Sequence, residues 1–82
     1  MSVTLKIYSA NWCSPCQQLK KTLSSNDLGI QTDILDVDES SDQATADQVR
    51  SVPTIILLEN GVEVKRTSGA KTLDQLKEFI KT

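Results

Sequence analysis

Both cysteines of the chain lie in one short segment, Trp12-Cys13-Ser14-Pro15-Cys16. Thiols at this spacing can close a small disulfide, and proline suits the first turn of a helix because the N–H that it lacks is unpaired there. Closing so short a loop removes little entropy from the unfolded chain, about 2 kcal/mol at most. The pair therefore suits a disulfide that opens and closes better than one that holds a fold together.

The two thiols are predicted to have different roles. A helix that begins beside Cys13 directs free N–H groups and its positive dipole end at that sulfur, which favours the thiolate. Cys13 is therefore the candidate nucleophile and Cys16, one turn further along, the resolving thiol. The alternatives are a metal half-site, shared in a dimer, or two idle cysteines. Redox use is favoured because the sequence has no histidine and no other cysteine, which leaves zinc two ligands short.

Length and composition restrict the classes of function. With 82 residues the chain predicts a single domain, residues 1–82, near the lower end of what folds alone. A net charge of −2, and only three aromatic residues, argue against nucleic acid as a direct partner. No apolar segment is long enough for a membrane span, and Met1–Lys6 does not resemble a signal peptide. The lack of further cysteines fits a reducing compartment, so a cytoplasmic protein is expected.

Apolar periodicity predicts the elements around the cysteines. Alternation from Val3 to Tyr8 predicts a strand that leads into the cysteine loop. A helix is predicted from about Pro15 to Asn26, with one apolar face. A second strand is expected from Ile30 to Val37, and its aspartates are typical of an edge strand.

The second half of the chain predicts two further helices and a hairpin. Ser40 with Gln43 fits a capping box, which opens a modest helix that extends to about Arg50. The apolar run Ile55–Leu58 predicts a central strand, and Asn60-Gly61 predicts a tight turn into a return strand. Thr72 with Gln75 forms another capping box before a final amphipathic helix, whose buried face consists of Leu73, Leu76, Phe79 and Ile80.

The predicted order of elements is β-α-β-α-β-β-α. The first three form a parallel unit with a right-handed crossover, and the hairpin adds two antiparallel strands. The expected fold is α/β, a four-stranded mixed sheet flanked by three helices. The cysteines then lie at the carboxyl edge of the sheet.

The chain resembles the thioredoxin superfamily, and thioredoxins more than glutaredoxins. The resemblance rests on Trp12–Cys16, on Val52-Pro53-Thr54, and on Asn60-Gly61 followed by Gly69-Ala70. It extends from Trp12 to the C-terminus. Because the chain begins at the strand that leads to the cysteines, the resemblance implies a minimal, glutaredoxin-sized thioredoxin fold.

The resemblance also implies roles for residues around the cysteines. Pro53 is expected to be cis and to face the disulfide, where it offers no N–H that would compete for the sulfur. The backbone of Val52 would pair with an extended substrate, in a groove that Trp12, Val52 and Gly69-Ala70 line. Ser14, which stands where thioredoxins usually have glycine, and Pro15 would support the site.

One departure concerns the proton of Cys16. Thioredoxins place a buried acid behind the second cysteine, at the position of Ile7, and its lysine partner at the position of Ile34. With isoleucine at both positions, this space is expected to be apolar. Cys16 would then have to lose its proton without a carboxylate base.

The resulting interpretation is a thiol–disulfide oxidoreductase that reduces protein disulfides as a monomer, without a metal or bound cofactor. The resemblance implies that an NADPH-dependent flavoprotein of the thioredoxin reductase kind returns the electrons. One alternative is a glutathione-dependent, glutaredoxin-like protein, in which Arg50, Lys65 and Arg66 are the candidates for binding carboxylates. Another is a thioredoxin-like binding module whose thiols are incidental.

Overall fold

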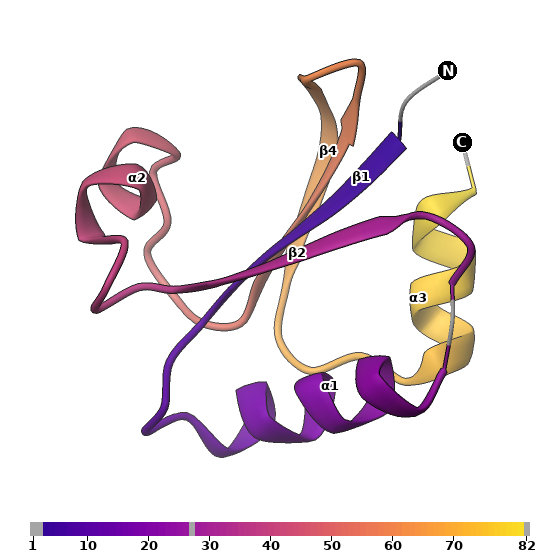
Figure 1. Cartoon of the computed structure of the whole chain (residues 1–82), viewed down its shortest axis with the longest axis horizontal. Helices are drawn as coiled ribbons and strands as arrows, with labels where there is room; N and C mark the ends of the chain where they lie inside the picture. The colour runs from indigo at the N-terminus through magenta and orange to yellow at the C-terminus, as the bar shows by residue number, and fades with distance from the viewer. Residues whose placement is uncertain (1–2, 27, 82) are drawn as a thin grey trace.

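The computed structural model describes residues 3–26 and 28–81, and the described elements follow the predicted order β-α-β-α-β-β-α (Figure 1). Met1 and Ser2 lie outside the described residues. They are the first two residues of the segment in which no signal peptide is predicted. The elements are β1 (Val3–Ser9), α1 (Ser14–Ser25), β2 (Gln31–Asp36), α2 (Ser41–Ala46), β3 (Thr54–Glu59), β4 (Val62–Ser68) and α3 (Leu73–Ile80). The predicted fold class is confirmed.

The strands form one mixed sheet in the order β2-β1-β3-β4. Strand β1 pairs in parallel with β2 and antiparallel with β3, which in turn pairs antiparallel with β4. The apolar strands are therefore central and β2 is an edge strand, as its aspartates indicate. Asn60 and Gly61 both adopt positive φ, +54° and +83°, as expected in the tight turn between β3 and β4.

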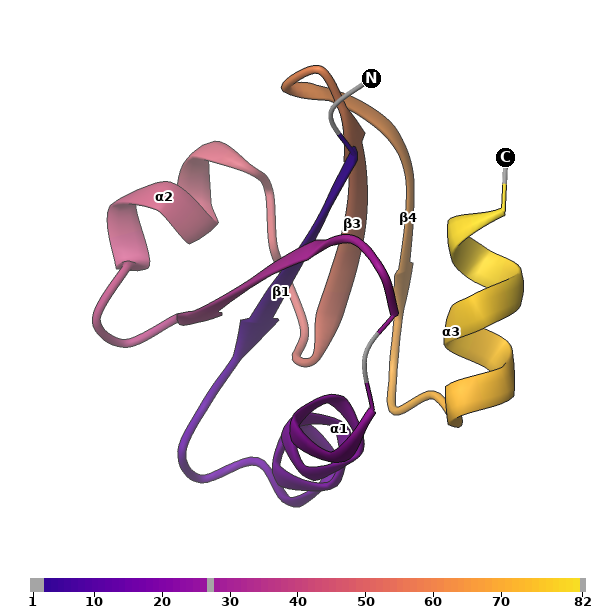
Figure 2. The ribbon, with the colours of Figure 1, turned by 45° about the vertical axis from the view of Figure 1, so that its right-hand side comes forward.

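Helices cover the two faces of the sheet unequally (Figure 2). Alternate residues of β1 and β3 pack with α1 and α3 into the larger core, which consists of Leu5, Ile7, Leu19, Ile55, Leu57 and Leu76. On the other face the short helix α2 contributes Ala44, which packs with Tyr8 and Ile56. Within residues 3–26 and 28–81, no helix combines the length and apolar character that crossing a membrane requires.

The two predicted capping boxes have different outcomes. At α3 the box is confirmed, because the Thr72 hydroxyl accepts the Gln75 N–H at 3.2 Å and the Gln75 side chain accepts the Thr72 N–H at 2.9 Å. At α2 the prediction is wrong: Ser40 is the N-cap residue, but its side chain makes no capping hydrogen bond.

Helix α2 also ends earlier than predicted, at Ala46 instead of about Arg50. Gln48 adopts the left-handed conformation, with φ +58°, and its N–H donates to the carbonyl of Thr45 at 3.0 Å. The N–H of Val49 donates to the carbonyl of Ala44 at 2.9 Å. These two bonds define a Schellman motif, in which Val49 folds back onto the α2 face of the sheet. The sequence did not predict this helix end, because Gln48 occupies the left-handed position where glycine is the usual signal.

Candidate active site

Cys13 is the N-cap residue of α1. Its backbone is extended, with φ −98° and ψ 110°, and its sulfur accepts a hydrogen bond from the N–H of Cys16 at 3.3 Å. Pro15 lies in the first helical turn, as predicted, and both Ser14 and Pro15 are exposed. The helix start thus supplies a donor and its positive dipole end to one sulfur.

Cys16 lies one turn inside the helix and is fully buried, whereas Cys13 keeps 7% of its surface exposed. Both are free thiols. The cluster around them is apolar and consists of Ala10, Val37 and Val52. Burial, together with the hydrogen bond to Cys13, raises the pKa of Cys16 to about 11. Cys16 therefore holds its proton at neutral pH.

The loop before β3 lies against the cysteines. The Val52–Pro53 peptide bond is cis, as the resemblance predicted. The Cys13 thiol donates to the Val52 carbonyl at 3.8 Å, and the Gly69 N–H donates to the Pro53 carbonyl at 2.9 Å. Gly69 adopts φ +88°, a conformation that favours glycine. Three segments that are far apart in the sequence are therefore linked here, because Val52 contacts Cys13 and Gly69 is bonded to Pro53.

Trp12 is 69% exposed, and its indole N–H donates to a carboxylate oxygen of Asp38 at 3.1 Å. Beside it lies an open groove of about 340 Å³, lined by Trp12, Val37, Val49, Arg50, Ser51 and Val52. Of the residues predicted to line a substrate groove, Trp12 and Val52 line this one and Gly69 does not. The sequence analysis named Arg50 only as a cation of the glutathione-dependent alternative, and it missed Asp38. Asp38 could have been predicted to lie near the cysteines, because it follows a strand that ends at the carboxyl edge of the sheet.

The apolar space expected from Ile7 and Ile34 is only partly present. Ile7 is fully buried in the core that α1 and α3 cover, together with Leu19. Ile34 is 44% exposed and lines an open groove, because it lies on the edge strand β2. The prediction is therefore wrong for Ile34. The cluster that surrounds Cys16 comes instead from Ala10, Val37 and Val52.

Comparison with known proteins agrees with this geometry. The Thioredoxin family model matches residues 2–82. The chain is 38% identical over 76 residues to a thioredoxin of Chlamydia trachomatis, and the match covers 89% of this chain and 74% of that protein. It is 32% identical over 78 residues to the mitochondrial thioredoxin of Bos taurus, covering 90% of this chain but 47% of the relative. The chain thus spans about half the length of the mitochondrial relatives that it matches.

Among solved structures, a single-site mutant of the thioredoxin from Halobacterium salinarum superposes with a TM-score of 0.90 at 34% identity, covering 96% of this chain and 72% of that one. Thioredoxin from Fasciola hepatica superposes with a TM-score of 0.84 at 28% identity, covering 96% and 78%. With the family model matching almost every residue, and a cysteine pair at the N-cap beside a cis-proline, this chain belongs to the thioredoxin family.

Proposed function

We propose that the protein is a thiol–disulfide oxidoreductase that reduces protein disulfides through Cys13 and Cys16. The observation that carries the proposal is the difference between the two thiols. Cys13 lies at the helix N-terminus and accepts the Cys16 N–H, whereas Cys16 is buried and its pKa is raised to about 11. One thiol is therefore suited to attack and the other to remain protonated until it is needed.

In the proposed cycle, the Cys13 thiolate attacks one sulfur of a substrate disulfide. The substrate S–S bond breaks, a Cys13–substrate disulfide forms, and the other substrate sulfur leaves as a thiolate that takes up a proton. Cys16 then loses its proton and attacks the sulfur of Cys13. The second substrate thiol is released and the Cys13–Cys16 disulfide remains, so two electrons have passed to the substrate without a bound cofactor.

The substrate is proposed to bind along the groove beside Cys13. Trp12 presents an exposed ring, Val52 lies at the Cys13 sulfur, and Gly69 holds the adjoining Pro53 through a backbone hydrogen bond. Ser14 and Pro15 support the site by forming the exposed first turn of α1. An extended disulfide-containing segment could contact Trp12 with its side chains and the Val52 segment with its backbone.

The positions of the cations disfavour the glutathione-dependent alternative. Lys65 donates to the Lys81 carbonyl at 3.1 Å and lies over the ring of Phe79, away from the groove. Arg66 is bound to Glu63 by two hydrogen bonds. Of the three candidate cations, Arg50 alone lines the groove beside Trp12.

The proposed setting is a reducing compartment, with the cytoplasm as the specific proposal, where a monomer would act. The sequence has no cysteine beyond this pair, which fits such a setting. The proposed electron donor is an NADPH-dependent flavoprotein of the thioredoxin reductase kind, because the family model and the relatives are thioredoxins.

Insulin reduction tests the proposal. With dithiothreitol as the electron source, the wild-type protein should accelerate the precipitation of reduced insulin, and Cys13→Ser should not. Equal rates for the two proteins would favour a binding module with incidental thiols. NADPH with thioredoxin reductase, and separately glutathione with glutathione reductase, then identify the donor that recycles the disulfide; recycling by glutathione alone would support the glutaredoxin-like alternative.

A further inference from the structure

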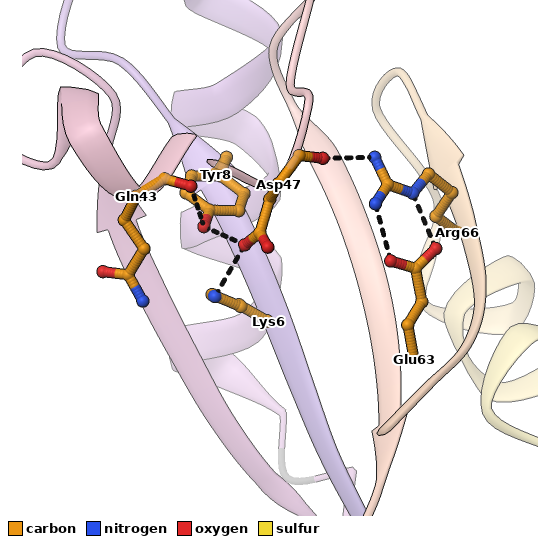
Figure 3. A network of polar contacts seen from close by, with 6 residues as sticks. All are labelled: Lys6, Tyr8, Gln43, Asp47, Glu63 and Arg66. Carbon is orange, nitrogen blue, oxygen red and sulfur yellow. Dashed lines mark hydrogen bonds and ion pairs between the residues drawn. The ribbon is translucent and has the colours of Figure 1, made fainter. Parts of the chain in front are cut away.

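A cluster of polar side chains joins helix α2 to the sheet on the face opposite α1 and α3 (Figure 3). Its centre is the carboxylate of Asp47, whose Oδ2 atom lies 2.7 Å from the ammonium nitrogen of Lys6. The hydroxyl of Tyr8 donates to the same oxygen and lies 3.3 Å from the carbonyl oxygen of Gln43. Two residues of β1 thus bind one carboxylate at the end of α2.

The backbone of Asp47 is bound as well. Its carbonyl oxygen accepts a hydrogen bond from the Arg66 guanidinium at 2.9 Å, and Glu63 orients that guanidinium through bonds of 2.6 and 2.8 Å (Figure 3). Asp47 is therefore connected to β1 through its side chain and to β4 through its backbone.

The contacts around Asp47 are partly shielded from solvent. Tyr8 is fully buried, and the Lys6 side chain is 16% exposed. The hydrogen bonds from Lys6 and Tyr8 lower the pKa of Asp47 below its ordinary value of 3.8. Burial and the bond to Asp47 raise the pKa of Tyr8. At neutral pH the cluster consequently pairs a carboxylate with an ammonium group and a neutral phenol.

Asp47 is also the C-cap residue of α2, so its position determines where the following residues go. The Schellman motif at Gln48 and Val49 turns the chain, and Arg50, Ser51 and Val52 then lead to the cis-proline. Residues 49–52 form much of the groove beside Trp12. At the far end of this segment, the Thr54 hydroxyl donates to the Ser51 carbonyl at 2.6 Å. The Asp47 cluster anchors its near end.

We propose that Asp47 is a positioning residue: by fixing residues 48–52 to β1 and β4, it keeps the Val52 side of the groove preformed for an extended polypeptide. Asp47 is not among the residues that line the groove, so it acts through the segment that it anchors. The inference rests on the proposed function in assigning a disulfide-containing polypeptide to this groove. A preformed loop lowers the entropy that is lost when substrate binds.

Two variants weaken the contacts of Asp47 in different ways. Tyr8→Phe removes one hydrogen bond but keeps the buried ring, and Asp47→Asn removes the charge but keeps the shape of the side chain. Leu28→Ala is the matched control for lost stability. Leu28 packs against the core that α1 and α3 cover. It precedes the first residue of β2, whereas the cysteines follow the last residue of β1, so the two lie at opposite ends of the parallel strands.

The first readout does not depend on activity. Hydrogen exchange of the Val49 amide, which donates to Ala44, should be about fivefold faster or more in Tyr8→Phe and in Asp47→Asn, relative to the amides of β1. Leu28→Ala should accelerate hydrogen exchange of the Val49 amide no more than that of the β1 amides. Unchanged relative exchange of Val49 in both cluster variants would overturn the proposal, even if the protein reduced no disulfide at all.

The second readout compares substrates of different size. Both cluster variants should raise KM for insulin about threefold or more, while the rate with 5,5′-dithiobis(2-nitrobenzoic acid), which is too small to span the groove, should stay within about twofold. Leu28→Ala should change neither. An equal loss with both substrates, or no loss with insulin, would overturn the positioning role. Failure of the wild-type protein to reduce insulin would instead contradict the proposed function.

Discussion

The backbone N–H of Cys16 points at the sulfur of Cys13, 3.3 Å away, so that one cysteine caps the helix that buries the other. N-cap positions usually carry an oxygen that accepts such a bond. Here a sulfur does so, and a thiolate in this place gains both a donor and the positive end of the helix dipole. Cys16 is buried among apolar side chains, and this burial, together with its hydrogen bond to Cys13, raises its pKa. Two identical side chains one helical turn apart therefore differ in burial and in hydrogen bonding.

The first prediction concerns the step in which Cys16 resolves the mixed disulfide. Because burial is the main cause of the raised pKa of Cys16 and persists when Cys13 is bonded to substrate, the thiolate fraction of Cys16 should rise about tenfold with each pH unit below that raised pKa. The resolution rate should therefore rise steeply from pH 6 to pH 9, a range that brackets the pKa of a free thiol, about 8.5. It can be measured by stopped flow with a fluorescent mixed disulfide. A flat profile would mean that another group takes the proton.

Ile7→Asp tests whether a carboxylate behind the cysteines can act as that base. Ile7 is fully buried, so an aspartate there should destabilise the fold by roughly several kcal/mol. It should also flatten the pH profile of resolution between pH 6 and pH 9. Ile7→Asn is the control, since it is equally polar but cannot titrate. An equal flattening by Ile7→Asn would contradict a role for the carboxylate.

A third prediction concerns stability in acid. The bonds from Lys6 and Tyr8 hold the pKa of Asp47 below 3.8, its value in an unfolded chain. The resulting stability is fully present above that value and is lost as pH falls through the lower pKa of the folded state. The free energy of unfolding, measured with urea, should therefore decline less steeply below about pH 4 in Asp47→Asn than in the wild type. Identical slopes would show that the cluster does not depend on this charge.

A fourth prediction uses the left-handed residue that ends α2. Gln48 adopts φ +58°, a conformation that costs a residue with a Cβ atom about 1–2 kcal/mol. Gln48→Gly removes this cost but adds entropy to the unfolded chain, so a net gain of about 0.5–1 kcal/mol is expected. Thermal unfolding should show a Tm higher by several degrees, and Gln48→Ala, which keeps the Cβ atom, should show no comparable gain. A lower Tm for Gln48→Gly would contradict the strain argument.

The sequence predicted the sheet, and the position of the cysteines at the start of α1, because both depend on local signals. Alternation in β1, the apolar run of β3 and the Asn60-Gly61 turn follow from periods and turn types within a few residues. The position of Cys13 at the helix start likewise follows from the spacing and from Pro15. The cis bond before Pro53 needed the resemblance, since spacing alone does not distinguish cis from trans.

Other features depend on contacts between distant residues and could not be predicted in this way. Lys6 and Asp47 are 41 residues apart, and only the folded sheet brings them together. The end of α2 depends on Gln48 adopting a conformation that usually indicates glycine. The exposure of Ile34 depends on which strand forms the sheet edge and on what covers it. For Lys6 and for Ile34 the deciding partner lies outside the local sequence window, whereas α2 ends at a local motif in which a residue with a Cβ atom takes the place of glycine.

The most direct test of the proposed function is to trap the intermediate of the two-step cycle. Cys16→Ser and Cys13→Ser are each mixed with insulin, quenched with acid and analysed by intact mass. We expect Cys16→Ser to accumulate a covalent adduct that reductant removes, because Cys13 attacks but nothing resolves the disulfide. Cys13→Ser should form none, since the remaining thiol is buried and protonated. An adduct on Cys13→Ser, or none on either variant, would contradict the assignment of Cys13 as the nucleophile.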